Sequence, residues 1–213
     1  MNIALIGATG FVGSKVLAEA LNRGHQVTAI VRTPAKVEAR AGLTVVQGDA
    51  ADAASLATLV KGQDAIVSAY NGPRGTPEFS QSYLAGVRSV ISAAKQSGVK
   101  RVLWVGGAGS LFVAPGVQLV DTPQFPEEYR TEAKTAREAL NIFGDESQLE
   151  WSFVSPAPLL VPGPRTGNFR LGGDQVLMDG DKPGSISVDD LAVAIVDELE
   201  KPAHIRRRFT LAY

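Results

Sequence analysis

The hydrophobic positions of this chain follow two alternating patterns. Short continuous apolar runs predict strands, and the segments between them repeat apolar residues every three or four positions, as amphipathic helices do. The runs predict strands at residues 3–6, 26–31, 44–47, 65–69, 101–105, 151–154 and 208–212. Helical spacing and capping residues predict helices at residues 12–23, 53–60, 79–97, 127–143 and 188–200. Strands that alternate with helices in this way predict a parallel sheet with right-handed crossovers.

The second half of the chain is less regular than the first. The connection at residues 106–126 is long, and connections of that length are usually functional or mobile. A proline-rich segment at residues 156–164 leads into the sequence RTGNF at residues 165–169. Ser187 with Asp190 three residues later predicts a capping box for the last helix.

Three glycines follow the first strand, in the sequence NIALIGATGFVGS, with the spacing G-x-x-G-x-x-G. Such a turn brings the backbone close to a pyrophosphate, and the next helix offers free N–H groups and a partial positive charge. Glycine also marks ordinary turns, so a plain strand–turn–helix is the alternative. The position after a strand and before a helix favours dinucleotide binding. The predicted cofactor contacts in this turn are Gly7, Thr9, Gly10, Phe11, Val12 and Gly13.

These patterns together predict a single domain over residues 1–213, with a small substrate-facing part at about 156–187. The fold class is α/β: a Rossmann-type doubly wound parallel sheet with helices on both faces. We expect the strand order 3-2-1-4-5-6 plus a short edge strand.

The end of the second predicted strand indicates which dinucleotide binds. NAD-binding proteins usually place an acidic residue there for the ribose 2′-hydroxyl, whereas this chain has Arg32 and Thr33, with Lys36 nearby. A guanidinium can bind a phosphate with two hydrogen bonds. We therefore predict a preference for NADP(H) over NAD(H). The alternative is that Arg32 is an ordinary solvated arginine at a strand end.

Ligands of such sheets lie beyond the carboxyl ends of the strands, which predicts further contacts. Asp49 and Ala50 follow the third strand, where the adenine is expected, although Asp49 is equally suited to be a helix cap. The residues predicted to lie near the nicotinamide half are Ala69, Tyr70 and Asn71. The glycines of GGAGS, at residues 106–110, allow a ligand to come close at Gly107 or simply bend the chain.

Composition excludes several other classes. The net charge of −1 gives no basic field for nucleic acid, and the absence of cysteine excludes disulfides and thiolate metal sites. No apolar run approaches the ~20 residues of a membrane span. The first strand begins at residue 2, so we expect no signal peptide and a cytoplasmic protein. Neither His25 nor His204 follows a strand's carboxyl end, and we assign them no catalytic role.

With GATGFVGS, Arg32, QGD after the third strand and VGGAGS after the fifth, the chain resembles the atypical short-chain dehydrogenase/reductases. It is most similar to the small NAD(P)H-binding branch with NmrA-like proteins, NADH-flavin reductases and biliverdin reductase B. The resemblance implies a Rossmann fold, NADP(H) and reduction of flavins, quinones or related planar acceptors. Residues 164–169 are similar to a segment beside the substrate pocket in the reductase members.

The typical enzymes of that superfamily use Tyr-x-x-x-Lys, in which both side chains share a helix face. Here Tyr129 and Lys134 are five residues apart, so they point in different directions. Lys134 is a candidate for the nicotinamide ribose, or a solvated lysine, and Ser110 is a candidate hydrogen-bond donor. The aromatic residues that could line an acceptor pocket, or pack in the core, are Phe79, Phe112, Phe125 and Phe169.

The leading hypothesis is an NADPH-dependent oxidoreductase that transfers hydride to a small planar acceptor. Delocalised acceptors such as flavins and quinones need orientation more than a placed proton donor. The alternative is a non-catalytic NAD(P)-sensing regulatory protein, and a sugar-nucleotide epimerase or dehydratase is less favoured because it needs the intact pair. We expect a small-molecule substrate and consider a homodimer possible. The cluster Arg206–Arg208 has no explanation beyond solvation or contact with a neighbouring chain.

Overall fold

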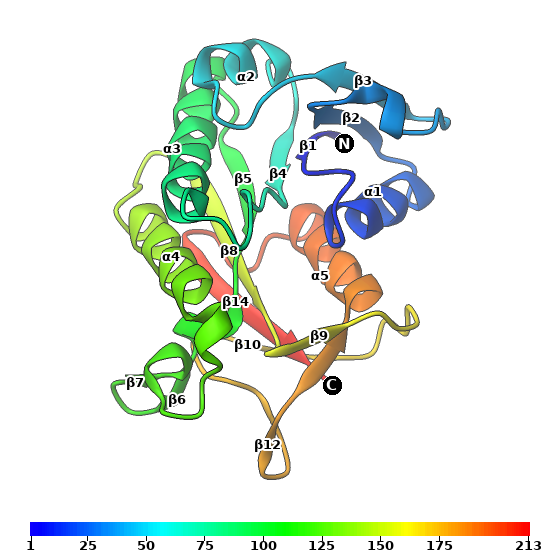
Figure 1. Ribbon diagram of the computed structural model, residues 1–213. Helices are drawn as coiled ribbons and strands as arrows, with labels where there is room; N and C mark the ends of the chain where they lie inside the picture. Colours follow the sequence, from blue (N-terminus) through cyan, green and yellow to red (C-terminus); the bar gives the residue numbers. More distant parts are fainter.

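A central sheet with helices packed on both faces forms the molecule (Figure 1). The computed structural model describes residues 1–213, and its main sheet has the strand order β10-β14-β8-β5-β4-β1-β2-β3. All of these strands except β10 run parallel. The parallel strands are β1 (Asn2–Ile6), β2 (Gln26–Val31), β3 (Leu43–Gln47), β4 (Ala65–Ser68), β5 (Arg101–Val105), β8 (Glu150–Pro156) and β14 (Arg207–Ala212).

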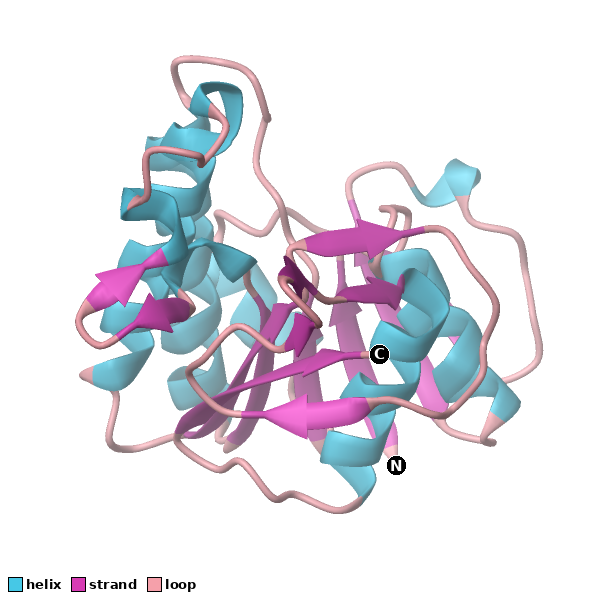
Figure 2. Ribbon diagram, turned by 90° about the horizontal axis from the view of Figure 1, so that it is seen from below, coloured by secondary structure: helices cyan, strands magenta, loops and turns pink.

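The sheet separates two apolar cores, because successive residues of a strand point to opposite faces. In β1, Ile3 and Leu5 enter one core while Ala4 and Ile6 enter the other. The first core includes side chains of α1 (Gly13–Asn22) and α5 (Val188–Glu200). The second includes α2 (Ala53–Leu59), α3 (Phe79–Ser97) and α4 (Glu127–Gly144). Figure 2 shows the strands between these two groups of helices.

The predicted strand order is confirmed, with β8 as the sixth strand. The last predicted strand, β14, lies parallel beside β8, and the short antiparallel strand β10 (Arg170–Gly172) forms the outer edge. The order 3-2-1-4-5 places the turn after β1 next to the ends of β2 and β4. The glycine turn therefore lies at the switch point of the sheet, where ligands of such folds bind.

Several short strands were not predicted. The long connection after β5 contains the 3₁₀ turns η2 (Ala108–Ser110) and η3 (Leu119–Asp121), with a small antiparallel pair between them. Strands of two or three residues have too few positions for an alternating pattern to show. The short pairs are β6 (Phe112–Ala114) with β7 (Val117–Gln118), β9 (Leu159–Val161) with β13 (Ser185–Ser187), and β11 (Met178–Asp179) with β12 (Lys182–Pro183).

None of the helices combines the length and the apolar character that a membrane span requires. A 3₁₀ turn, η1 (Pro34–Lys36), follows β2, in agreement with the proline at its start.

Candidate functional site

The turn between β1 and α1 is closed by glycines that cannot carry side chains. Gly7 has a φ of +86°, and a Cβ atom added to it would lie 2.7 Å from the carbonyl oxygen of Ala69. A Cβ atom on Gly13 would lie 2.0 Å from the Gly7 carbonyl oxygen. The turn is thus folded against itself and against the end of β4. Its backbone, rather than side chains, forms the surface that a ligand would meet.

Unpaired backbone donors face this turn. Helix α1 begins at Gly13 after Val12, which makes no side-chain cap, and the N–H groups of Phe11 and Val12 donate to no acceptor in the chain. The Phe11 side chain is 51% exposed, and Thr9 and Gly10 are exposed as well. Free amides at a helix N-terminus bind anions because the partial positive charge of the helix is concentrated there. This geometry fits a pyrophosphate.

Arg32 is exposed directly after β2, and its guanidinium belongs to no ion pair of the structure. It lies close enough to Tyr70, at the end of β4, to influence that phenol. Burial raises the pKa of Tyr70, the charge of Asp49 raises it further, and the charge of Arg32 opposes them. Arg32, Asp49 and Tyr70 follow the parallel strands β2, β3 and β4 at one edge of the sheet, and we refer to them as one cluster. The expectation that Tyr70 lies near the nicotinamide half stays a prediction.

Local hydrogen bonds show whether Asp49 caps the helix that follows it. Its carboxylate accepts a hydrogen bond of 2.9 Å from the Ala51 N–H, which closes a short turn. The cap of α2 is Asp52, which accepts a hydrogen bond of 3.0 Å from the Ser55 N–H. Asp49 is thus an exposed carboxylate after β3 and no helix cap, while the neighbouring Ala50 is buried.

Tyr70 has its ring held against α3. A Cβ atom on Gly86 would lie 2.5 Å from the Tyr70 ring, so only glycine fits there. The ring also stacks on Tyr83, with 6.4 Å between the ring centroids. Its neighbour Asn71 is exposed and Ala69 is half-buried. Packing against α3 therefore fixes the position of the Tyr70 ring.

The glycines after β5 serve packing at two positions. A Cβ atom on Gly106 would lie 2.0 Å from the Phe153 ring, and one on Gly109 would lie 2.6 Å from the Ala133 side chain on α4. Gly107 differs, because its nearest neighbour would be Ala136 at 3.7 Å, an ordinary contact. Gly107 thus remains the position of this turn that is available to a ligand.

Ser110, one of the two candidate catalytic residues, is directed toward β14. Its side chain is 2% exposed, and its hydroxyl oxygen accepts a hydrogen bond of 2.9 Å from Arg208. Arg208 is itself buried and pairs with Asp174 at 2.7 Å, which explains one member of the arginine cluster. Ser110 fastens η2 to the sheet in this structure. To contact an acceptor it would have to share or release that bond.

Lys134, the second candidate, is exposed on α4 and belongs to no hydrogen bond or ion pair of the structure. Tyr129, on the first turn of the same helix, is 51% exposed. Of the four phenylalanines, Phe79 is a core residue at 3% exposure that stacks on Tyr83, Phe112 is half-buried at the start of β6, and Phe169 packs against the α1–α5 core. Phe125 lies beneath the Arg130 guanidinium.

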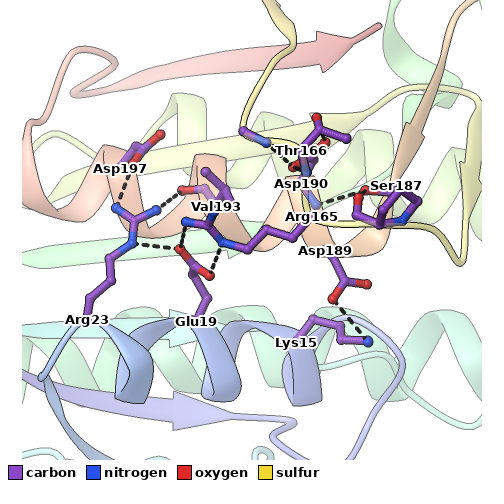
Figure 3. Close-up of polar contacts among 12 residues, drawn as sticks. Lys15, Glu19, Arg23, Arg165, Thr166, Ser187, Asp189, Asp190, Val193 and Asp197 are labelled. Atoms are coloured by element: carbon purple, nitrogen blue, oxygen red, sulfur yellow. Dashed lines mark hydrogen bonds and ion pairs between the residues drawn. The ribbon is translucent and has the colours of Figure 1, made fainter.

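A second cluster, which the sequence did not indicate, lies where residues 162–168 cross α1 and α5 (Figure 3). Two buried carboxylates, those of Glu19 and Asp190, hold this segment. Asp190 was expected only as part of a capping box. The Ser187 hydroxyl does accept the Asp190 N–H at 3.0 Å, but the Asp190 carboxylate binds the crossing segment instead.

The fold and this glycine turn define a dinucleotide-binding protein. A family model described as NAD(P)H-binding matches residues 7–202. The chain therefore belongs to the NAD(P)H-binding family. This agrees with the resemblance of its motifs to the small NAD(P)H-binding branch of the atypical short-chain dehydrogenase/reductases.

Three known proteins are similar over almost their whole length. The uncharacterised protein YwnB of Bacillus subtilis is 39% identical over 99% of this chain and 98% of its own. A solved structure from Bacteroides thetaiotaomicron, described as a candidate epimerase, has 44% identity and a TM-score of 0.91, covering 100% of this chain and 96% of that one. A candidate NADH-flavin reductase from Streptococcus pneumoniae has 34% identity and a TM-score of 0.88, covering 100% and 99%.

Proposed function

We propose that this protein is a reductase that uses NADPH to reduce a small planar acceptor of the flavin or quinone type. The observation that carries the proposal is the pair of free N–H groups, those of Phe11 and Val12, in the turn between β1 and α1. Arg32, which has no ion-pair partner, follows the neighbouring strand β2. A guanidinium without a carboxylate partner is suited to the 2′-phosphate that distinguishes NADPH from NADH. When bound, the dinucleotide supplies a hydride from its nicotinamide ring.

The chain's own residues have the task of binding and orientation. Free amides of the turn would hold the pyrophosphate, and Arg32 with Tyr70 would bound the adenosine end. The region near Ala69 and Gly107, at the ends of β4 and β5, would receive the nicotinamide and the acceptor. Holding two reactants in line in this way supplies most of what a hydride transfer to a delocalised ring requires.

The type of acceptor follows from the proton donors. Tyr129 and Lys134 are five residues apart on α4, and Ser110 is occupied by Arg208. A carbonyl that becomes an alkoxide needs a placed donor, whereas a reduced flavin or quinone spreads its charge and takes a proton from water. The similarity to a candidate NADH-flavin reductase supports this acceptor class, although that description specifies NADH.

The same features favour one alternative, a dinucleotide-sensing protein without turnover. Such a protein would bind the dinucleotide at the same glycine turn and would need no proton donor. An epimerase reading follows from the description of one relative, but it has less support because epimerases of this fold rely on the intact tyrosine–lysine pair.

The test combines binding and turnover. Binding titrations of NADPH and NADH are measured beside NADPH oxidation, followed by absorbance, with riboflavin, FMN and a panel of quinones. Turnover with any of these acceptors and preferential NADPH binding would support the reductase. Tight binding without turnover would favour the sensor, and no binding of either nucleotide would contradict both.

A further inference from the structure

Residues 162–168, here called the strap, connect the acceptor side of the fold to the outer surface of α1 and α5 (Figure 3). The chain leaves the carboxyl end of β8 at Pro156, forms β9 and then enters the strap. Because the strands are parallel, that end of β8 lies at the same edge of the sheet as the ends of β4 and β5. Residues 157–161 thus connect that end of β8 to the strap, and within them β9 pairs with β13.

One anchor of the strap is Asp190 on α5, which is fully buried. Its carboxylate accepts hydrogen bonds of 2.8 Å from the N–H groups of both Thr166 and Gly167, and one of 2.8 Å from the Tyr213 hydroxyl. The Thr166 hydroxyl adds a further bond. No cation pairs with this carboxylate, so releasing the strap would leave a buried charge with few partners. Releasing this anchor is therefore costly, and exchange of the Thr166 and Gly167 amides reports how firmly the strap is held.

A hydrogen bond of 2.9 Å from the Ser187 hydroxyl to the Pro164 carbonyl also holds the strap to α5. The second anchor is Arg165, which reaches across to Glu19 on α1. Its Nε and Nη2 groups donate to the two oxygens of the Glu19 carboxylate, each at 2.8 Å. The Glu19 side chain is 6% exposed, whereas that of Arg165 is 53% exposed. A planar two-bond contact of this kind fixes direction as well as distance.

Arg23 makes this second anchor different from the first. Its Nε group donates to Glu19 at 2.7 Å, and its Nη1 group donates to both Asp197 and Glu200 of α5, at 2.6 and 2.9 Å. Glu19 therefore keeps a cationic partner when Arg165 is absent. Removing Arg165 alone should free the strap from α1 without exposing an unpaired buried carboxylate, so the protein should remain folded.

Helix α1 links this anchor to the dinucleotide turn. Glu19 lies one helical turn after Lys15, and Lys15 pairs with Asp189 at the start of α5 at 3.1 Å. We propose that Arg165 is a positioning residue for the acceptor: it fastens the strap to the helix whose N-terminus holds the dinucleotide, and so fixes residues 157–161 beside the nicotinamide end. The assignment of the acceptor side rests on the proposed function; the fastening of the strap does not.

The test compares Arg165→Gln with wild type in two independent measurements. Amide hydrogen exchange of Thr166 and Gly167, resolved by NMR, should become about two- to fivefold faster, the range expected for loss of a partly exposed ion pair. The KM for a flavin or quinone acceptor should rise by about the same factor, while kcat and the NADPH dissociation constant change less than about twofold. Arg165→Lys should recover part of both effects, because an ammonium cannot form the two-bond contact.

The matched control is Lys95→Gln. It also removes an exposed cation from a buried glutamate, Glu146, but on α3, which packs on the opposite face of the sheet, and it should change neither measurement. Unchanged exchange at Thr166 and Gly167 in Arg165→Gln overturns the proposal, whether or not the wild type turns over an acceptor. A rise in the NADPH dissociation constant as large as the rise in the acceptor KM also overturns it, because this result would assign Arg165 to the cofactor. Faster exchange in a protein without turnover supports the fastening and contradicts only the proposed function.

Discussion

Arg32 is exposed at the carboxyl end of β2 and has no carboxylate partner. A free guanidinium at this position would form charge-assisted hydrogen bonds with a 2′-phosphate, and a carboxylate would repel it. Asp49 of the same cluster is exposed as well. Because Asp49 is negative, Arg32 is the residue of the cluster that supplies a positive charge for the phosphate.

We predict that Arg32→Glu weakens NADPH binding about 10–100-fold, which corresponds to a charged hydrogen bond of about 1.5–3 kcal/mol. NADH binding should change much less, because NADH has no 2′-phosphate. Titration of both nucleotides checks the prediction, with Arg88→Glu, the same change at an exposed site on α3, as control. Equal losses for the two nucleotides would refute the assignment of Arg32.

Gly13 is the position of the turn where an added side chain would make the shortest contact. A methyl group there would collide with the backbone carbonyl of Gly7, and backbone cannot move aside as a flexible side chain can. Gly13→Ala should therefore destabilise the protein by roughly 1–3 kcal/mol or abolish folding, and the variant that folds should lose nucleotide binding. Urea unfolding and NADPH titration measure both effects. Gly144→Ala, at the end of α4 with open space around it, should be neutral; a neutral Gly13→Ala would show that the turn is wider than described.

At the scale of elements, α5 depends on its N-terminus for more than a helix cap. Ser187 caps the helix and also donates to the Pro164 carbonyl at 2.9 Å, while Asp190 receives donors from the strap and from Tyr213. The N-terminal turn of α5 thus connects the helix, the strap and the end of β14. Loss of the Asp190 charge should affect all three.

We expect Asp190→Asn to cost about 2 kcal/mol or more, because the amide nitrogen cannot accept the N–H groups that now reach a carboxylate oxygen. The midpoint of thermal unfolding should fall by roughly 5 °C or more for a chain of this size. Ser187→Ala, which removes the cap and the hydrogen bond to the Pro164 carbonyl, should cost less, about 1 kcal/mol. Calorimetry of the two variants distinguishes them. A smaller loss for Asp190→Asn than for Ser187→Ala would contradict the anchoring role.

At the scale of the whole molecule, carboxylates that accept several hydrogen bonds connect helices and strands on both faces of the sheet. The hydrogen bond from Arg165 is the largest effect that lowers the pKa of Glu19. Burial raises the pKa of the others, but their hydrogen bonds outweigh it, so the pKa of each lies below its ordinary value. These groups are Glu146, Asp190, Glu198 and Glu200.

Carboxyl groups with lowered pKa values in the folded state bind fewer protons than in the unfolded chain. Their stabilisation is complete above the ordinary values, 4.5 for glutamate and 3.8 for aspartate, and is lost as the pH falls through the lowered values. We therefore predict that the free energy of unfolding decreases steeply between about pH 5 and pH 3. Urea unfolding at several pH values measures this slope. A constant free energy over that interval would contradict the ion-pair description.

The sequence by itself determined the sheet order, the helices on both faces and the glycine turn. These follow from local periodicity and from glycines that a tight turn requires, and both are visible in consecutive residues. The family model matches far more of the chain than this turn, residues 7–202. Arg32 could also be located from sequence, because its position relative to the end of β2 defines its place.

Only the tertiary structure decided what distant residues do together. Ser110 meets Arg208 across 98 positions of the chain, and Glu19 meets Arg165 across 146. No local pattern encodes such pairs, because they arise when strands and helices are brought together by the burial of two cores. The structure thereby showed that Gly106 and Gly109 serve packing and that two buried carboxylates hold the strap.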